Sequence, residues 1–265
     1  MDRRAGGARA GFAVLAVTVG VLGAVTGCAT KGIPYKTPSS TPTAAATAPT
    51  SAAALPTASM TPLAAASGQL TGTGLESVLL PASSFPAGFT APASGPITSG
   101  GTVISAVPTY HLATMACAAF VEQLGETGFG ETALAAVSLT GARQVFGELI
   151  YQFATAPAAT GFVAGIRSLA ARCGKFTVTS NGETGTYSLK AADGAAIGGH
   201  PALSLVETGA TGGTPLVIDT LFSPSGVDVF AASAVGIDTG APAVPAAGTI
   251  VYNLMKRQAA AAVLG

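Results

Sequence analysis

A long run of small and turn-forming residues sets the first limit on what this chain can fold into. Between residues 37 and 59 every residue is Thr, Pro, Ser or Ala, with the single exception of Leu55. Such a segment buries too little apolar surface to offset the conformational entropy that it would lose on ordering. We therefore expect residues 28–70 to form a disordered tether and residues 71–265 to form one folded domain.

The N-terminus has the layout of a bacterial lipoprotein signal peptide. Three arginines among the first nine residues precede eighteen uncharged residues, Ala10 to Gly27, which are rich in Val and Leu. Val25-Thr26-Gly27-Cys28 resembles the lipobox, in which small residues fit the peptidase and the Cys receives a diacylglyceryl group. We expect residues 1–27 to be removed and Cys28 to anchor the chain to the outer face of the cytoplasmic membrane. The alternative is an uncleaved transmembrane helix, for which about eighteen residues are just long enough.

Composition excludes some classes of partner. Charged residues make up 9% of the chain, and the formal net charge is zero. A neutral chain has no electrostatic attraction for nucleic acid, so we expect no nucleic-acid partner. The absence of Trp leaves few platforms on which sugars could stack. The partners that we expect are the membrane, through the lipid, and a small ligand or envelope protein that the sequence does not identify.

The folded part contains three helical patterns. They lie at residues 113–125 and 155–174 and from Pro245 to about Ala262. Thr155 can cap the second helix, and Gly174 ends it. The apolar stripe of the first helix consists of Cys117, Phe120, Val121 and Leu124, that of the second of Phe162, Ile166, Leu169 and Cys173, and that of the last of Ile250, Val251 and Leu254.

Strand patterns separated by short turns fill the rest of the domain. Asn181-Gly182 is a strong type I′ hairpin signal, and Ser223-Pro224-Ser225-Gly226 predicts a second tight turn. Consecutive strands that are joined by such turns pair antiparallel. The predicted strands are residues 102–107, 132–139, 143–154, 175–180, 184–190, 202–207, 216–222 and 227–235.

The cysteines add a cross-link. Once Cys28 is assigned to the lipid, Cys117 and Cys173 remain, and an oxidising compartment favours their pairing. The bridge would hold two helices on the same side of the sheet and contribute roughly 4 kcal/mol by the chain-entropy estimate. A reactive thiol or a metal site is the alternative, but neither cysteine has a His or Cys neighbour in the sequence. The fold class is therefore α+β: a mainly antiparallel sheet with two disulfide-linked helices packed on it and a C-terminal helix.

This order of elements resembles a known family. A Cys-bearing helix, a strand with Gln144-Val145 and Phe153, a helix that ends at Cys173, antiparallel strands and a terminal helix are similar to the extracellular sensor domain of mycobacterial Ser/Thr protein kinases. The resemblance covers about residues 71–260. It implies a cleft that senses a ligand or signal. That family usually has a second disulfide and Trp residues, both of which this chain lacks, and no further site residue is carried over.

Catalytic and cofactor motifs are absent from the sequence. There is no nucleophile elbow, His-Glu-x-x-His, EF-hand or phosphate-binding loop. The glycines between Gly125 and Gly130 follow a helix rather than a strand, and we interpret them as a loop. His111 and His200 are the two histidines, and both are interpreted as ordinary loop residues. We therefore expect no enzymatic activity, no cofactor and no metal.

Two pairs of acids were considered as catalytic candidates. Glu122 and Glu126 are four residues apart on one predicted helix, where a solvated face is the commoner explanation. Asp219 and Asp228 lie on the two strands that flank Ser223–Gly226 and could face one another, although outward-facing charges at an edge are the simpler interpretation.

Two functions remain open. The first is a ligand-binding or sensing domain displayed on a tether, and the second is a carrier of a lipophilic cell-envelope molecule. A large internal cavity would favour the carrier, and a filled core with an open cleft would favour the sensor. An enzyme of unfamiliar type would need a cleft in which a histidine and a carboxylate converge.

Overall fold

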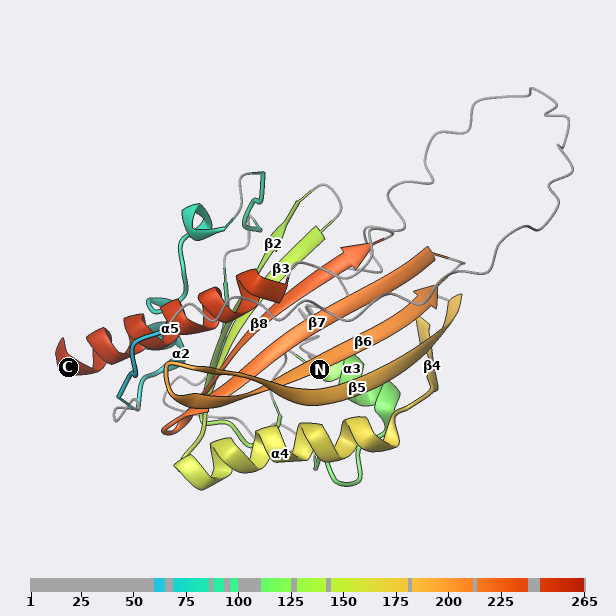
Figure 1. Cartoon of the computed structure of the whole chain (residues 1–265), viewed down its shortest axis with the longest axis horizontal. Coiled ribbons are helices and arrows are strands. Elements are labelled where there is room, and N and C mark those ends of the chain that lie inside the picture. The colour runs from blue at the N-terminus through green and yellow to red at the C-terminus, as the bar shows by residue number, and fades with distance from the viewer. Residues whose placement is uncertain are drawn as a thin grey trace, which may run out of the picture.

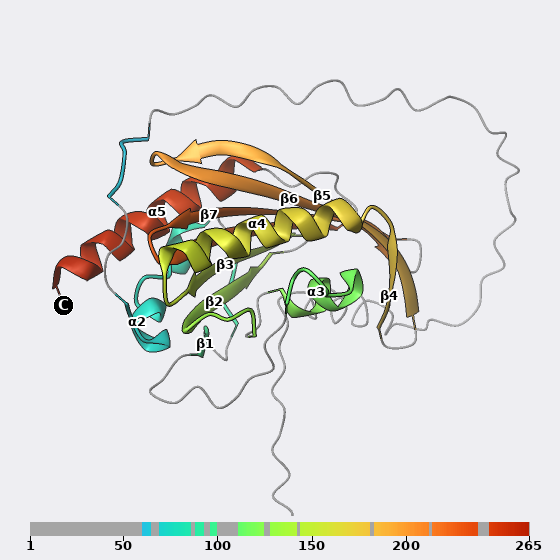
Figure 2. The same ribbon diagram turned by 90° about the horizontal axis from the view of Figure 1, so that it is seen from below.

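The computed structural model describes residues 60–64, 69–85, 88–92, 96–99, 111–124, 128–141, 144–180, 183–211, 214–237 and 244–264. Its centre is an eight-stranded sheet with the order β1-β2-β3-β8-β7-β6-β5-β4 (Figure 1). Every neighbouring pair of these strands is antiparallel. Helices α3 and α4 pack on one face of the sheet, and α2 and α5 pack on the other (Figure 2). The α+β class, with its C-terminal helix, is confirmed.

The bounds of the elements are close to those that the sequence patterns predict. The strands are β1 (Ile97–Ser99), β2 (Ala133–Thr140), β3 (Gln144–Gln152), β4 (Phe176–Ser180), β5 (Glu183–Ile197), β6 (His200–Thr211), β7 (Thr214–Ser225) and β8 (Asp228–Ile237). The helices are α2 (Gly72–Glu76), α3 (Cys117–Gln123), α4 (Ala156–Arg172) and α5 (Val244–Leu264), with one 3-10 turn, η1 (Ala82–Ser84).

The sheet is assembled from two antiparallel blocks. Strands β1 to β3 form the first block, and α4 then crosses one face to reach the far edge of the sheet. From there β4 to β8 run back as a meander until β8 pairs with β3. The β3–β8 pair therefore joins segments that are distant in the sequence, and both strands lie in the interior of the sheet.

Helix α4 forms where capping and periodicity predict it. The Thr155 hydroxyl accepts the backbone N–H of Ala158 at 3.3 Å, and Pro157 occupies the first turn, where its missing N–H costs nothing. Each apolar side chain of its stripe contributes about 1.5–3 kcal/mol when it is fully buried. The buried residues of α4 are Ala159, Phe162, Ile166, Leu169 and Ala170.

Strand β8 is apolar on both faces. Its alternate side chains pack under α5 on one face and under α4 on the other, because successive residues of a strand point in opposite directions. Phe230, Ala232 and Ala234 belong to the cluster under α5, whereas Val229 and Ala231 belong to the cluster under α4. A strand that is covered on both faces consists mostly of consecutive apolar residues, and the sequence of β8 is of this kind.

One predicted turn is misplaced. The sequence analysis assigns a turn to residues 223–226, but β7 continues through Ser225, and the register pairs Ser225 with Asp228. The turn is Gly226-Val227, and Gly226 has a φ of 62°, which glycine adopts without strain. Pro224 lies beyond Phe222, the last β7 residue that pairs with β6, so its missing N–H removes no bond from that ladder.

Strand β1 is not among the predicted strands, and the remaining differences are mainly in length. The first predicted helix, 113–125, is shorter and spans α3 alone, whereas β5 extends well beyond residue 190. Ser180 pairs with Glu183, so β4 and β5 form the predicted hairpin, although Asn181 and Gly182 themselves lie outside the described residues. The predicted strand 102–107 lies outside the described residues.

Candidate functional site

The two cysteines that the sequence analysis pairs are bonded in the structure. Cys117 begins α3 and Cys173 directly follows α4, and their Cα atoms are 5.6 Å apart. Both helices contribute to the apolar cluster on the same face of the sheet. The predicted bridge and its placement are confirmed. Cys28, the predicted lipidation site, lies outside the described residues.

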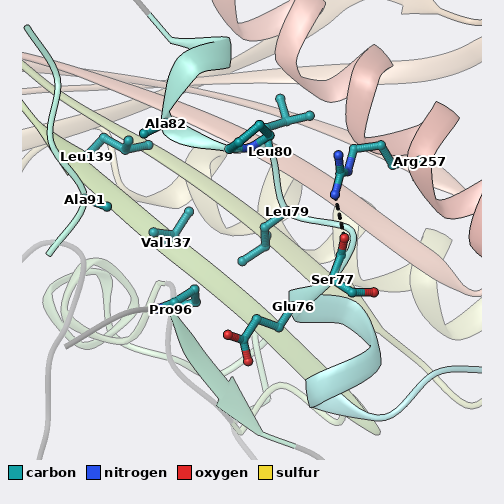
Figure 3. A pocket seen from close by; sticks show the side chains of 11 residues that line it. Glu76, Ser77, Leu79, Leu80, Ala82, Ala91, Pro96, Val137, Leu139 and Arg257 are labelled. Carbon is teal, nitrogen blue, oxygen red and sulfur yellow. Dashed lines mark hydrogen bonds between the residues drawn. The ribbon is translucent and has the colours of Figure 1, made fainter. Parts of the chain in front are cut away.

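A pocket of about 320 Å³ opens on the face of the sheet that α5 covers (Figure 3). Its volume is at the lower end of the ~300–1,000 Å³ that is usual for small-molecule sites. Its floor consists of four buried aliphatic side chains: Leu79, Leu80, Val137 and Leu139. The rim is more exposed and consists of Glu76, Ser77, Pro81, Ala82, Ala91, Pro96 and Arg257.

Local structure explains why these residues meet. Val137 and Leu139 are two positions apart on β2, so they point to the same face. Thr90 pairs with Thr140 at the end of β2, with N–H to O distances of 3.0 and 2.9 Å in the two directions. That bridge holds the segment containing Ala91 beside the strand, so the segment forms one wall of the pocket.

The opposite wall belongs to a segment that we call the N-terminal strap, residues 69–82. Arg257 of α5 fixes it by donating from Nε to the Val78 carbonyl at 2.7 Å and from Nη2 to the Ser77 carbonyl at 2.6 Å. Figure 3 shows the guanidinium group directed at Ser77. The pocket wall and the last helix are therefore connected through backbone carbonyls.

Glu148 of β3 holds the same strap from below. Its Oε1 accepts the backbone N–H of Leu80 at 2.9 Å, and it pairs across the ladder with Val137 of the pocket floor. The carboxyl group is fully buried, and its Oε2 has no hydrogen-bond partner. Desolvation raises the pKa of Glu148 from 4.5 to about 8, against smaller lowering effects of the Leu80 hydrogen bond and the Arg257 charge. At neutral pH this group is therefore mostly protonated.

A second buried polar network lies further along the same face. Asp228 accepts hydrogen bonds from Gln152 Nε2 at 3.0 Å and from Gln258 Nε2 at 2.9 Å, and Gln152 Oε1 accepts the Leu70 N–H at 2.9 Å. The network thus connects the strap, β3, β8 and α5. Burial raises the pKa of Asp228 to about 6, while the two amides act in the opposite direction.

The expectation that Asp219 and Asp228 are outward-facing edge charges is wrong. Asp228 is completely buried and Asp219 is 8% exposed, because β7 and β8 are interior strands and α5 covers this face. The two residues do not pair with one another: Asp219 is opposite Ala234 in the ladder. Burial also raises the pKa of Asp219, which accepts a hydrogen bond from Ser204 at 3.3 Å.

One more buried acid lies on the other face of the sheet. Glu207 of β6 is 4% exposed, and its Oε1 has no hydrogen-bond partner. Desolvation raises the pKa of Glu207 to about 8. The hydroxyls of Thr220 and Ser233 lie on the same face and are 2.9 Å apart. The sequence analysis did not single out any member of this group.

Neither histidine is bonded to a carboxylate among the residues that the structure describes. His111 is exposed before α3, and His200 begins β6, where its Nε2 lies 3.0 Å from the Leu63 carbonyl and 3.3 Å from Ser225 Oγ. Within the described part of the chain, no three His, Cys, Asp or Glu residues are placed to hold a metal. Glu126 lies outside that part, and Glu122 lies on α3.

The sequence signal for the buried acids was present but incomplete. Gln144, Glu148 and Gln152 recur at every fourth position of β3, and this spacing places them on one face of the strand. A polar stripe of that kind normally indicates a strand face that is exposed to solvent. Glu148 and Gln152 are buried because α5 and the strap, which are distant in the sequence, close over them.

The pocket combines apolar, charged and buried polar groups. The pocket has an aliphatic floor, two charged groups at its rim and a mostly protonated carboxyl group behind its floor. Among the described residues, no helix is long and apolar enough to cross a membrane.

Comparison with known proteins identifies the fold. No protein-family profile and no curated protein matches the sequence. Among solved structures, the extracellular domain of PknH from Mycobacterium tuberculosis matches with a TM-score of 0.51 and 16% identity, over 71% of this chain and 96% of that one. A putative uncharacterized protein from Mycobacterium smegmatis, a Rv0999 ortholog, matches at 15% identity over 69% of this chain and 93% of that one, with a TM-score of 0.35. The resemblance to the fold of a kinase sensor domain is confirmed.

Proposed function

We propose that this chain is a lipoprotein, anchored through Cys28 on the extracytoplasmic side of the membrane, whose domain binds a small and largely apolar ligand and acts as a sensor. The pocket carries this proposal. Its buried aliphatic floor, its exposed rim and its volume of about 320 Å³ are the properties of a small-molecule site. A site of this kind gains affinity by removing apolar surface of the ligand from water.

Three observations support an extracytoplasmic location. The N-terminus ends in a lipobox-like Val25-Thr26-Gly27-Cys28, and a disulfide links Cys117 and Cys173. Disulfides persist mainly in oxidising compartments. The fold also resembles that of a domain described as extracellular.

The position of the pocket supports a sensing role. One wall of the pocket is the N-terminal strap, and the chain upstream of the strap is the predicted tether. A ligand that packs against Leu79 and Leu80 changes the stability of the segment that connects the domain to its anchor. Binding in the pocket is in this way coupled to the point from which the domain is held.

Ligand binding is tested by native mass spectrometry of the full-length protein purified from its own membrane. We expect a small adduct that is lost in Ala91→Trp, because an indole at this rim position occupies the pocket. Ala171→Trp, at an exposed site on α4 across the sheet, is the matched control and should retain the adduct. A protein without an adduct, or one whose adduct survives in Ala91→Trp, contradicts the proposal. An adduct with the mass of a long-chain lipid favours the alternative, a carrier of a lipophilic envelope molecule.

The anchor is tested separately with Cys28→Ala. We expect this variant to accumulate as unprocessed precursor or to appear in the soluble fraction, and to incorporate no labelled palmitate, because the acyl chains supply the membrane affinity. Labelled, membrane-bound Cys28→Ala protein would exclude the lipid-anchor assignment and leave the pocket proposal intact.

A further inference from the structure

The charged groups at the pocket differ in how well they are paired. Arg257 is held by two backbone carbonyls of the strap, at 2.7 and 2.6 Å. The Glu76 carboxylate has no hydrogen-bond or ion-pair partner among the residues that the structure describes; only the backbone carbonyl of Glu76 accepts a hydrogen bond, from the Leu79 N–H at 3.1 Å. Figure 3 shows its carboxylate on the side of the pocket near Pro96, directed away from the guanidinium group. The pocket therefore presents one acceptor-only group that is available to a ligand.

The second carboxyl group near the pocket contributes little to the charge of the pocket. Glu148 lies behind the floor, beside Val137, and accepts the N–H of Leu80. Its second oxygen is buried without a hydrogen-bond partner among the described residues. Since the group is mostly protonated at neutral pH, it adds little negative charge, and the Glu76 carboxylate is the one anionic group among the described lining residues. Arg257 is the cation of the rim, and its Nε and Nη2 donate to the strap carbonyls rather than to Glu76.

The geometry points to ligands that combine an apolar body with a cationic amine. The apolar body would lie on Leu79, Val137 and Leu139, and the ammonium group would bind the Glu76 carboxylate at the rim. An ammonium group is a compact donor of three hydrogen bonds and fits an acceptor that has no other partner. This inference rests on the proposed function, because it assigns a ligand class to the same pocket.

The test uses three probes of nearly equal size: 4-fluorobenzylamine, 4-fluorobenzyl alcohol and 4-fluorobenzoate. Their binding to the full chain is measured by fluorine NMR titration. We expect the amine to bind about three- to fivefold more tightly than the alcohol, which is the range of a partly exposed ion pair, and the benzoate to bind more weakly than both. The amine preference should decrease with added salt, since salt screens exposed charges.

Two variants separate the charge effect from a loss of folding. Glu76→Gln should reduce the ratio of amine to alcohol affinity to about one and leave alcohol binding unchanged. Asp193→Asn removes an exposed carboxylate on β5, outside the pocket, and should keep the wild-type ratio. Equal binding of amine and alcohol, or tighter binding of benzoate, overturns the inference while the pocket remains a ligand site. Absence of binding by all three probes contradicts the proposed function itself.

Discussion

Four buried carboxyl groups make the stability of this domain depend on pH in an unusual direction: those of Glu148, Glu207, Asp219 and Asp228, whose pKa values are all raised by burial. Burial raises the pKa values of Glu148 and Glu207 from 4.5 to about 8 and that of Asp228 from 3.8 to about 6. Between the ordinary and the raised value, the folded protein keeps a proton that the unfolded chain has released. The free energy of unfolding therefore falls as the pH rises through that window, by at most about 1.4 kcal/mol per pH unit and group.

We predict that the domain is most stable below about pH 4.5 and loses stability steadily up to about pH 8. Urea denaturation at half-unit pH steps measures the slope. Glu148→Gln combined with Glu207→Gln should flatten the curve between pH 5 and 8, because glutamine is neutral throughout. Asp193→Asn, which removes an exposed carboxylate, is the control for loss of charge. A wild-type curve that rises from pH 5 to 8 is the opposite of this prediction.

At the scale of single elements, two glycines that look alike in the sequence should respond oppositely to substitution. Gly226 forms the β7–β8 turn with a φ of 62°, and a side chain in that left-handed region costs about 1–2 kcal/mol. Gly161 lies inside α4, and apart from its two chain neighbours and the backbone of the helix itself no heavy atom lies within 4 Å of a Cβ built there. Alanine is favoured over glycine in a helix by about 1 kcal/mol. We predict that Gly226→Ala lowers the melting temperature and Gly161→Ala raises it; equal shifts would contradict the turn geometry.

The Cys117–Cys173 disulfide also acts at the scale of single elements. It joins α3, a helix of only seven residues, to the end of α4 across 56 residues of chain. We predict that reduction lowers the free energy of unfolding by about 2–4 kcal/mol while the circular dichroism of the sheet is retained. The Cys117→Ser, Cys173→Ser double variant should have this lower stability with or without reductant. Two free thiols in the denatured, unreduced Cys28→Ser protein would exclude the bond.

The elements themselves could be predicted because their signals are local. The cap at Thr155, the stripe of α4 and the Asn181-Gly182 hairpin each depend on neighbours within a few residues. The pairing of Cys117 with Cys173 follows from the number of cysteines that remain after Cys28 and from the oxidising compartment. Ser223–Gly226 was misjudged because Pro is typical of turns, and only the position of Pro224 beyond the end of the β6 ladder shows why a strand accepts it.

The site could not be predicted because its parts come from segments that are distant in the sequence. Val137 and Glu148 are ladder neighbours, but Leu80 and Arg257 reach them from opposite ends of the domain. Whether a strand face is solvated or covered depends on such contacts. For that reason Asp228 was expected to face outward and is buried.

At the scale of the whole molecule, the position at which the chain first packs on the domain determines how the domain is connected to the predicted tether. The sequence analysis ends the tether at residue 70, yet residues 60–64 are in contact with the domain. Leu63 donates its N–H to the Gly198 carbonyl at 2.9 Å, and its own carbonyl lies 3.0 Å from His200 Nε2. Met60 and Leu63 are partly buried against the apolar cluster under α5. These contacts fix the chain upstream of the strap to the β5–β6 hairpin.

Limited proteolysis can therefore distinguish a domain that begins near residue 60 from one that begins near residue 70, where composition alone places the boundary. We predict that limited proteolysis of the full chain by proteinase K leaves a resistant fragment whose N-terminus lies at or before Met60, because Leu63 is bonded through both its N–H and its carbonyl. His200→Ala removes one of these bonds and should move the cut site to between Leu63 and Leu70, with the rest of the domain still resistant. His111→Ala, at an exposed position before α3, should leave the fragment unchanged. A wild-type fragment that already begins near Leu70 would show that the contacts of residues 60–64 do not hold the chain in solution. The coupling of the pocket to the tether would then depend on the strap alone.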